Sequence, residues 1–198
     1  MTGWIPTQWF ICWGLATLSA VVFLPFGWAV KGHFVRKAGL PGGMKLLTAV
    51  SLASYGWMFL NLGQRDAPPR VGEMIATFLL MLTSASLFWW AIAATREKRL
   101  HLAHSGYGSD YVQFVGPYRW IRHPFYTSYI VFWVGTGLLG GYRQWLPVII
   151  IIVWYICLAR SEEKQFAASP LSADYEAYRR RTGMVLPRLG AFRRSSQC

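Results

Sequence analysis

The chain has 198 residues, of which 54% are hydrophobic and only 14% are charged. An ordinary soluble domain carries about 25% charged residues, so this composition excludes one and predicts an integral membrane protein. The formal net charge is +12, yet no basic stripe interleaved with stacking aromatic residues lies on a polar segment. The charge therefore does not predict nucleic-acid binding, and it is typical of basic residues that flank membrane spans.

The apolar runs predict the helices in chain order. Residues 9–30, 46–63 and 74–94 are each close to the 20 or so apolar residues that a helix needs to cross a membrane. A further apolar stretch, 125–159, is broken by Gly-Gly-Tyr-Arg-Gln at 140–144, which predicts a tight hairpin of two short helices. The fold class we expect is therefore all-α, a polytopic membrane bundle of about five transmembrane helices. The first run lacks a basic leader region and a cleavage site, so we expect it to be retained.

The distribution of Lys and Arg tests the five-span prediction. Seventeen of the 20 fall in the first loop, the third loop and the tail, and three fall in the second and fourth loops. Because positive residues concentrate in cytoplasmic loops, we expect the N-terminus outside and the C-terminus in the cytoplasm.

Two polar regions, 95–123 and 160–198, then lie on the cytoplasmic face, where chemistry is expected. The first is predicted to start as a helix over 95–103 that continues the third span and to loosen at 105–108. The second is predicted to start helical at 160–163 and to resume over 174–181, with Tyr175 and Tyr178 on one face. We divide the chain into an N-terminal three-helix region, 1–104, and a C-terminal cofactor-binding region, 105–198, within one integral domain.

The densest polar cluster is Gly-Pro-Tyr-Arg-Trp-Ile-Arg-His-Pro-Phe-Tyr at 116–126, just before the fourth apolar span. Arg and Tyr at a helix entrance commonly anchor topology, and Pro suits the first turn of a helix. Two Arg, a His and a Tyr beside a membrane helix also suit an anionic ligand.

Adjacent carboxylates, Glu162 and Glu163, follow the fifth span. Their simplest interpretation is a solvated helix face. Paired carboxylates near a membrane also suit a cationic group, such as a sulfonium or an amine.

Together these clusters resemble the C-terminal signature of the isoprenylcysteine carboxyl methyltransferase and phospholipid methyltransferase superfamily. That signature is Gly-x-Tyr-x-x-x-Arg-His-Pro-x-Tyr, a helical hairpin, Glu-Glu, Tyr-x-x-Tyr, basic residues and Leu-Pro. The chain departs from it at Ser128, where Gly is common, and at 170–173, where Phe-Gly is absent. It matches at Gly116, Tyr118, Arg122, His123, Pro124, Tyr126, Glu162, Glu163, Tyr175, Tyr178, Arg179, Arg180, Arg181, Leu186 and Pro187.

The resemblance implies an integral membrane methyltransferase that uses S-adenosyl-L-methionine. It implies a cofactor pocket between the hairpin and the C-terminal helices, for which we expect Tyr118, His123, Pro124, Tyr126, Glu162 and Glu163 as binding residues. The catalytic candidates are Arg122, Glu163 and Arg119, with either Arg orienting an acceptor carboxylate.

The expected acceptor is lipid-like or prenylated, most simply the carboxylate of an isoprenylcysteine-like molecule. A carboxylate with a pKa of about 4 is already nucleophilic at pH 7 and needs no base. Three alternatives stay open: N-methylation of an amine phospholipid with Glu162, Glu163 or His123 as base, a non-catalytic membrane scaffold, and a membrane reductase. Membrane lipids are expected neighbours, and no nucleic acid or obligate protein partner is inferred.

Three features of the sequence resemble binding motifs but are not expected to bind a cofactor or a metal. The sequence Gly-Thr-Gly-Leu-Leu-Gly at 135–140 lacks the strand that a dinucleotide fingerprint requires, so its glycines are expected to let helices pack closely. His101, His104 and Glu97 fit a solvated helix better than a metal site, and the three cysteines show no Cys-x-x-Cys spacing. We therefore expect no bound metal and no disulfide framework.

Overall fold

The computed structural model describes residues 4–34, 41–97, 100 and 111–188, with side-chain environments from residue 7 onward. Within these ranges it is all-helical apart from one isolated bridge between Ile121 and Gly183. The long helices are α1 (Trp4–Gly32), α2 (Gly42–Gly63), α3 (Val71–Ala94), α4 (Pro124–Gly140) and α5 (Trp145–Ala167). Two short 3₁₀ turns, η1 (Gly116–Arg119) and η2 (Tyr142–Gln144), precede α4 and α5, and α6 (Ser172–Arg181) follows them.

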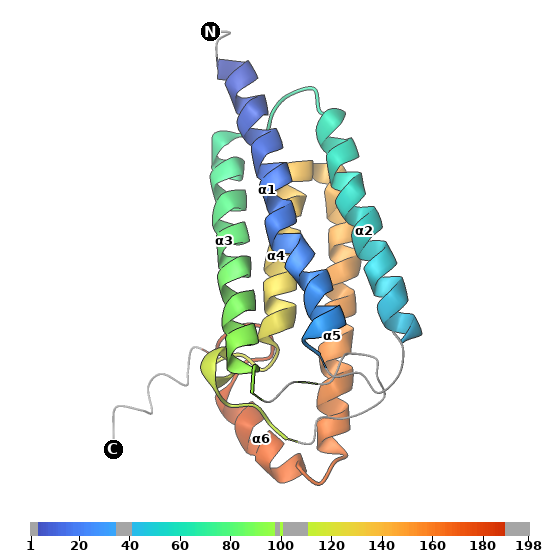
Figure 1. Cartoon of the computed structure of the whole chain (residues 1–198), viewed down its shortest axis with the longest axis vertical. Helices are drawn as coiled ribbons and strands as arrows, with labels where there is room; N and C mark the ends of the chain where they lie inside the picture. The colour runs from blue at the N-terminus through green and yellow to red at the C-terminus, as the bar shows by residue number, and fades with distance from the viewer. Residues whose placement is uncertain (1–3, 35–40, 98–99, 101–110, 189–198) are drawn as a thin grey trace, which may run out of the picture.

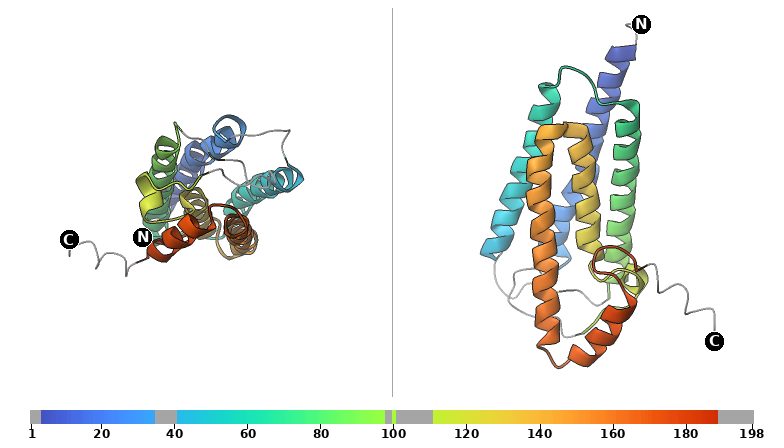
Figure 2. Two further views of the ribbon diagram at one scale, coloured as in Figure 1. Left: turned by 90° about the horizontal axis from the view of Figure 1, so that it is seen from below. Right: turned by 180° about the vertical axis from the view of Figure 1, so that it is seen from behind.

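The five long helices run alongside one another, and α6 lies across one end of the bundle (Figure 1). We call this the α6 end and the opposite end, where α4 turns into α5, the η2 end. Helix α4 lies between α3 and α5 in both side views (Figures 1 and 2) and also packs against α1 and α2. The predicted all-α bundle with a helical hairpin is therefore confirmed.

Within the described ranges, four helical segments are long and apolar enough to cross a membrane: Thr7–Gly32, Gly42–Gly63, Val71–Ala94 and Tyr142–Ala167. The fourth predicted span, α4, has 17 residues, which is about 25 Å of helix and short of a hydrocarbon core of about 30 Å. The expectation that both hairpin helices are short is wrong for α5, which has 23 residues. It continues through the polar sequence that follows the apolar run.

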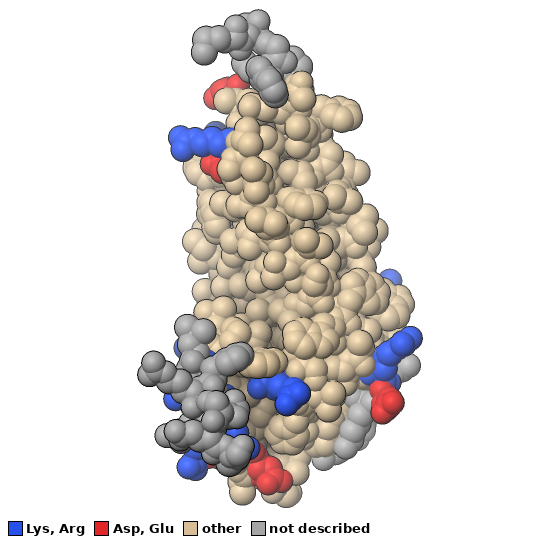
Figure 3. Space-filling model, turned by 90° about the vertical axis from the view of Figure 1, so that its left-hand side faces the viewer, with Lys and Arg blue, Asp and Glu red and all other residues tan. Residues whose placement is uncertain are grey.

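The outer surface of the bundle is apolar along its length. Large hydrophobic side chains such as Phe10, Leu24, Leu60 and Leu146 are mostly exposed. Figure 3 shows the consequence on one face: Lys, Arg, Asp and Glu gather towards the two ends, and a wide uncharged band separates them. A surface of this kind is stable in lipid, so the chain is a multi-pass membrane protein.

Small residues allow α3 and α4 to approach closely. A Cβ added at Gly135 would lie 2.9 Å from Met81 Cε, and across the same interface the Ser84 hydroxyl donates to the Ser128 carbonyl at 2.8 Å. The prediction that the Gly-rich sequence at 135–140 serves helix packing is confirmed at this position.

The predicted continuation of the third span over 95–103 is wrong at its start. Helix α3 ends at Ala94, and residues 95–97 form a turn and bends. The Thr95 hydroxyl donates to the Ala91 carbonyl and also meets His33 Nε2 at 2.8 Å, which ties the end of α3 to the end of α1. The rest of the predicted helix, apart from Leu100, lies outside the described residues. The predicted loosening at 105–108 and the pair His101 and His104 lie outside them as well.

Candidate active site

The Arg-His-Pro segment is fixed by the stretch of chain that follows α6. The backbone N–H of Arg122 donates to the Gly183 carbonyl at 2.9 Å, and that of His123 donates to the Met184 carbonyl at 3.1 Å. Pro124 then starts α4 at a position where a missing N–H costs nothing. Residues about 60 positions apart in the sequence therefore hold Arg122 and His123 at the α6 end.

The Glu163 carboxylate is surrounded by positive groups. Arg122 Nε lies 2.7 Å from Glu163 Oε1, His123 Nε2 lies 3.4 Å from the same oxygen, and Arg179 Nε lies 3.8 Å from Oε2. The Arg122 and Glu163 side chains are only 8% and 12% exposed. Arg122 Nη1 also donates to the Thr182 carbonyl at 2.5 Å. The pair is thus a buried ionic contact that joins the start of α4, α5 and the end of α6.

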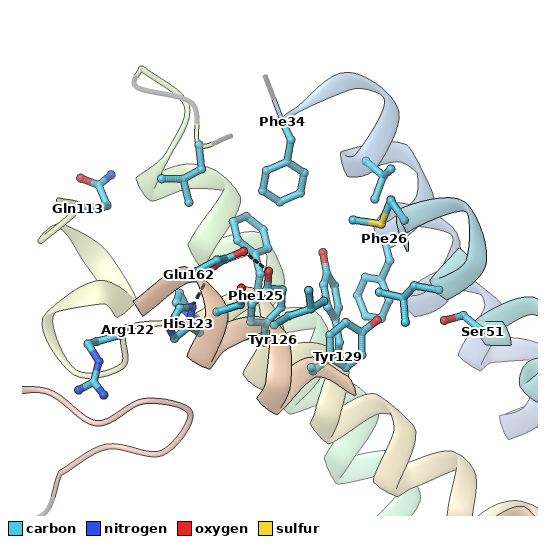
Figure 4. A pocket seen from close by; sticks show the side chains of 18 of the residues that line it. Phe26, Phe34, Ser51, Gln113, Arg122, His123, Phe125, Tyr126, Tyr129 and Glu162 are labelled. Carbon is cyan, nitrogen blue, oxygen red and sulfur yellow. Dashed lines mark hydrogen bonds and ion pairs between the residues drawn. The ribbon is translucent and has the colours of Figure 1, made fainter. Parts of the chain in front are cut away.

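Glu162, one residue earlier, faces a different neighbour. The Tyr126 hydroxyl donates to Glu162 Oε1 at 2.5 Å, and His123 Nδ1 lies 3.5 Å from Oε2 (Figure 4). The His123 and Tyr126 rings are stacked with centroids 5.5 Å apart. His123 therefore lies between the two carboxylates, with one ring nitrogen towards each.

The electrostatics of His123 follow from this position. Burial lowers the pKa of the imidazole, but hydrogen bonds and negative charge from Glu162 and Glu163 outweigh it, so the pKa is raised above its ordinary value of 6.5. The ring is accordingly more readily protonated than a free histidine at neutral pH.

A cavity of about 860 Å³ opens beside this cluster and extends into the bundle. Its α6 end is polar and includes Arg122, His123 and Glu162. Its deeper part is mostly apolar and aromatic, with walls from α1, α2, α4 and α5. Figure 4 shows Arg122 and His123 on one side and Phe26, Tyr129 and Ser51 on the other. We call these parts the polar chamber and the aromatic chamber. The deeper wall includes Phe23, Phe26, Met44, Leu47, Ser51, Tyr129, Trp133 and Tyr155.

The predicted site residues divide into three groups. Tyr118, Arg122, His123, Pro124, Tyr126 and Glu162 line the cavity. Glu163 is not among the lining residues and acts from behind, through Arg122 and His123. Arg119 ends η1 as an exposed residue and does not line the cavity either, so the structure gives no support to its predicted catalytic role.

Sequence reasoning missed the aromatic chamber. Tyr155, Leu158, Glu162 and Phe166 all line the cavity from α5, and their spacing of three and four residues is the signal that places them on one helix face. The α1 wall residues Phe23, Phe26 and Val30 have the same spacing, but exposed apolar residues lie on the opposite side of α1 and of α2, so the spacing does not single out the wall there.

The residues that line the cavity suit a nucleoside-containing cation. Among the described residues no group of three or more His, Cys, Asp or Glu side chains is placed to hold a metal. The Tyr118 hydroxyl is buried, borders the cavity and has no hydrogen-bond partner within the described ranges. Such an orphaned group suits a polar ligand atom. The Glu162 carboxylate suits ribose hydroxyls or an amine, and the aromatic rings suit adenine or a sulfonium.

Fold and site together define a multi-pass helical membrane protein with a buried ionic cluster at the polar end of an aromatic cavity. No protein-family model matches the chain. The chain is 26% identical over 170 residues to methanethiol S-methyltransferase 2 of Bradyrhizobium diazoefficiens, a match covering 79% of this chain and 64% of the relative. It is 27% identical over 164 residues to methanethiol S-methyltransferase of Mycobacterium tuberculosis, covering 75% and 66%.

The chain is thus a distant homologue of methanethiol S-methyltransferases, which belong to the isoprenylcysteine carboxyl methyltransferase-like family of integral membrane methyltransferases. The predicted resemblance is confirmed. The chain spans slightly less than two thirds of the length of these two relatives.

Proposed function

We propose that this protein transfers a methyl group from S-adenosyl-L-methionine to an apolar acceptor held inside the membrane. One observation carries the proposal: a single cavity joins the polar chamber at His123 and Glu162 to the aromatic chamber within the bundle. Methyl transfer requires the two reactants to be aligned at about 3 to 3.5 Å and shielded from water. A continuous cavity with a polar and an apolar part supports the proposal, because it can hold the two reactants next to each other within the bundle.

The cofactor supplies an electrophilic methyl group on a positively charged sulfur. The residues of this chain bind and orient it: Glu162 and His123 suit its polar groups, and Tyr118 and Tyr126 offer aromatic faces for the base or the methyl group. Glu163 keeps Arg122 and His123 in place. These roles rest on which residues line the cavity and on the distances among them.

For the acceptor, we favour a thiol. The Arg122 guanidinium already bonds Glu163 and the Thr182 carbonyl, so it is poorly placed to receive the carboxylate that the sequence predicted for it. The two relatives are named as enzymes that methylate a thiol. An aromatic, largely uncharged chamber suits a neutral apolar thiol.

Carboxyl O-methylation of an isoprenylcysteine-like molecule is the second candidate. Lys31 lines the cavity from α1 and brings a positive charge that a carboxylate would need. A prenyl chain would also fit an aromatic chamber. The two candidates differ in the chemistry of the reacting atom and agree on the cofactor.

Calorimetric titration of the detergent-purified protein with S-adenosylhomocysteine tests the cofactor assignment. We expect binding by the wild type and at least a tenfold loss of affinity in His123→Ala and Glu162→Ala, with Arg160→Ala, an exposed cation outside the cavity, as matched control. Transfer of radiolabelled methyl to an alkanethiol and to a farnesylcysteine then separates the two acceptors. Absence of wild-type binding would overturn the proposal and leave the scaffold or reductase alternatives.

A further inference from the structure

The junction between the two chambers is occupied by a tyrosine that is hydrogen-bonded to a carboxylate. Tyr126 lines the cavity, and its ring centroid lies 5.6 Å from that of Tyr155 and 6.5 Å from that of Tyr129 in the aromatic chamber. Its hydroxyl donates to Glu162 at 2.5 Å. Tyr126 therefore lies where the two chambers meet: its ring is next to the tyrosines of the aromatic chamber, and its hydroxyl is bonded to the carboxylate of the polar chamber.

A thiol acceptor must lose a proton before it is methylated, whereas a carboxylate acceptor is already ionised at pH 7. An alkanethiol resembles the cysteine side chain, whose pKa is about 8.5, so it is mostly protonated at pH 7, and only the thiolate is a good nucleophile. A site for thiols must therefore remove a proton. Among the described residues that line the cavity, Glu162 is the one carboxylate, and it accepts a hydrogen bond from the hydroxyl of Tyr126, which also lines the cavity.

We propose that Tyr126 and Glu162 form a proton relay that deprotonates a thiol acceptor; the inference rests on the function proposed above. The acceptor S–H bond breaks, its proton passes to the Tyr126 oxygen, and the Tyr126 proton passes to Glu162. A bond forms between the acceptor sulfur and the methyl carbon, while the bond from that carbon to the cofactor breaks and leaves its electron pair on the cofactor sulfur. The products are a neutral methyl thioether and the demethylated cofactor, and one proton is left over.

The structure provides an exit for that proton. The Glu162 side chain is 32% exposed, whereas His123 is 9% exposed, so Glu162 reaches water at the α6 end. His123 Nδ1, 3.5 Å from Glu162, keeps the carboxylate oriented. The other ionisable groups around the relay come from every neighbouring element: Lys31 of α1; Tyr111, Tyr118 and Arg122 of the segment before α4; Tyr129 of α4; Tyr155 and Glu163 of α5; Tyr175, Tyr178 and Arg179 of α6.

The first test is the pH dependence of kcat/KM with an alkanethiol. We expect Tyr126→Phe and Glu162→Gln to lose about 100-fold to 10,000-fold at pH 7, in the range of a lost general base. The loss should shrink as pH rises and the thiol ionises in water. An arylthiol that is mostly ionised at neutral pH should restore the rate of Tyr126→Phe to within a fewfold of the wild type. Tyr155→Phe, which removes another hydroxyl from the aromatic chamber, should keep the wild-type shape of the pH profile.

The second test does not depend on turnover. Calorimetry in two buffers of different ionisation enthalpy counts the protons released when octanethiol binds in the presence of sinefungin, a non-reactive cofactor analogue with a positive charge. We expect about one proton per thiol for the wild type and for Tyr155→Phe, and none for Tyr126→Phe. Equal proton release and equal pH profiles in the wild type and Tyr126→Phe would overturn the relay, as would no release by the wild type.

Binding of S-adenosylhomocysteine separates this inference from the function on which it rests. If Tyr126→Phe binds it within a fewfold of the wild type while the proton count is unchanged, the relay alone fails. If the wild type binds neither S-adenosylhomocysteine nor sinefungin, the methyltransferase proposal fails as well.

Discussion

Glu162 and Glu163 are neighbours in the sequence but do different things in the structure. Consecutive residues of a helix point about 100° apart, so Glu162 faces the cavity and Glu163 faces Arg122 and the end of α6. The sequence predicted both as cofactor ligands. The structure makes Glu162 the accessible carboxylate and Glu163 the group that positions Arg122 and His123.

Arg122 and Arg119 form a matched pair for testing burial. Arg122→Ala leaves the Glu163 carboxylate largely buried without its closest partner, which typically costs about 3 to 5 kcal/mol. Arg119 is exposed, and its replacement by Ala should change the free energy of unfolding by less than about 0.5 kcal/mol. Unfolding in mixed micelles measures both. Equal effects of the two substitutions would contradict the assignment of Arg122 to the structural core of the site.

The raised pKa of His123 predicts a pH-dependent stability. Because the pKa is higher in the folded protein than the 6.5 of an unperturbed histidine, the protonated ring contributes stability that is complete below pH 6.5 and is lost as pH rises through the folded value. The thermal midpoint of the wild type should therefore fall between pH 6 and pH 9 more than that of His123→Gln. A wild-type curve parallel to that of the variant would contradict the two carboxylate contacts of His123.

At the scale of elements, the segment after α6 determines the shape of the site. It pairs with residues 120–123, and the Thr127 hydroxyl at the start of α4 donates to the Val185 carbonyl at 2.8 Å. The segment turns sharply at Gly183, so that the Leu186 carbonyl oxygen comes back against it. A Cβ added at Gly183 would lie only 1.6 Å from that oxygen. Residues 182–185, which lie between the basic residues and the Leu-Pro of the family signature, thus support the Arg-His-Pro segment through backbone contacts.

Gly183→Ala should disrupt this support. The added methyl forces the turn to open, which we expect to cost about 1 to 3 kcal/mol and to weaken S-adenosylhomocysteine binding at least tenfold. Gly56→Ala in α2 is the control, since a Cβ there meets nothing within 4 Å. Its stability should equal that of the wild type or exceed it slightly. Normal cofactor affinity in a folded Gly183→Ala protein would show that the turn does not position the site.

At the scale of the whole molecule, the site lies at the end of the bundle where Lys and Arg are abundant. The positive-inside rule predicts that this end faces the cytoplasm, where S-adenosyl-L-methionine is made and consumed by most methylation reactions. The aromatic chamber lies within the apolar part of the bundle, so the proposed function predicts that an apolar acceptor enters from the lipid and a polar cofactor from the water phase.

Cysteine labelling tests this orientation. In a background in which Cys12, Cys157 and Cys198 are replaced, we expect a membrane-impermeant maleimide added to intact cells to label Asp66→Cys at the η2 end. Asp174→Cys in α6 should react only after the membrane is permeabilised. Both positions are exposed in the structure. The opposite pattern would reverse the predicted topology.

The sequence by itself determined the membrane class, the helix order and the residues of the polar chamber. Long apolar runs leave few alternatives to membrane helices, and a motif such as Arg-His-Pro keeps its residues adjacent wherever it lies. The helical start at 160–163 was predicted, but not that it continues α5 without a break as far as Ala167. The end of α3 at Ala94 was not predicted either, and there the Thr95 hydroxyl bonds to His33.

Only the tertiary structure decided what each polar residue faces. It separated Glu162 from Glu163, placed Arg119 outside the cavity and assembled the aromatic chamber from α1, α2, α4 and α5. The physical reason is that lipid-facing and cavity-facing positions in a membrane helix are both apolar, so the pattern of hydrophobicity does not distinguish them. The direction of a side chain becomes known only when the neighbouring helices are in place.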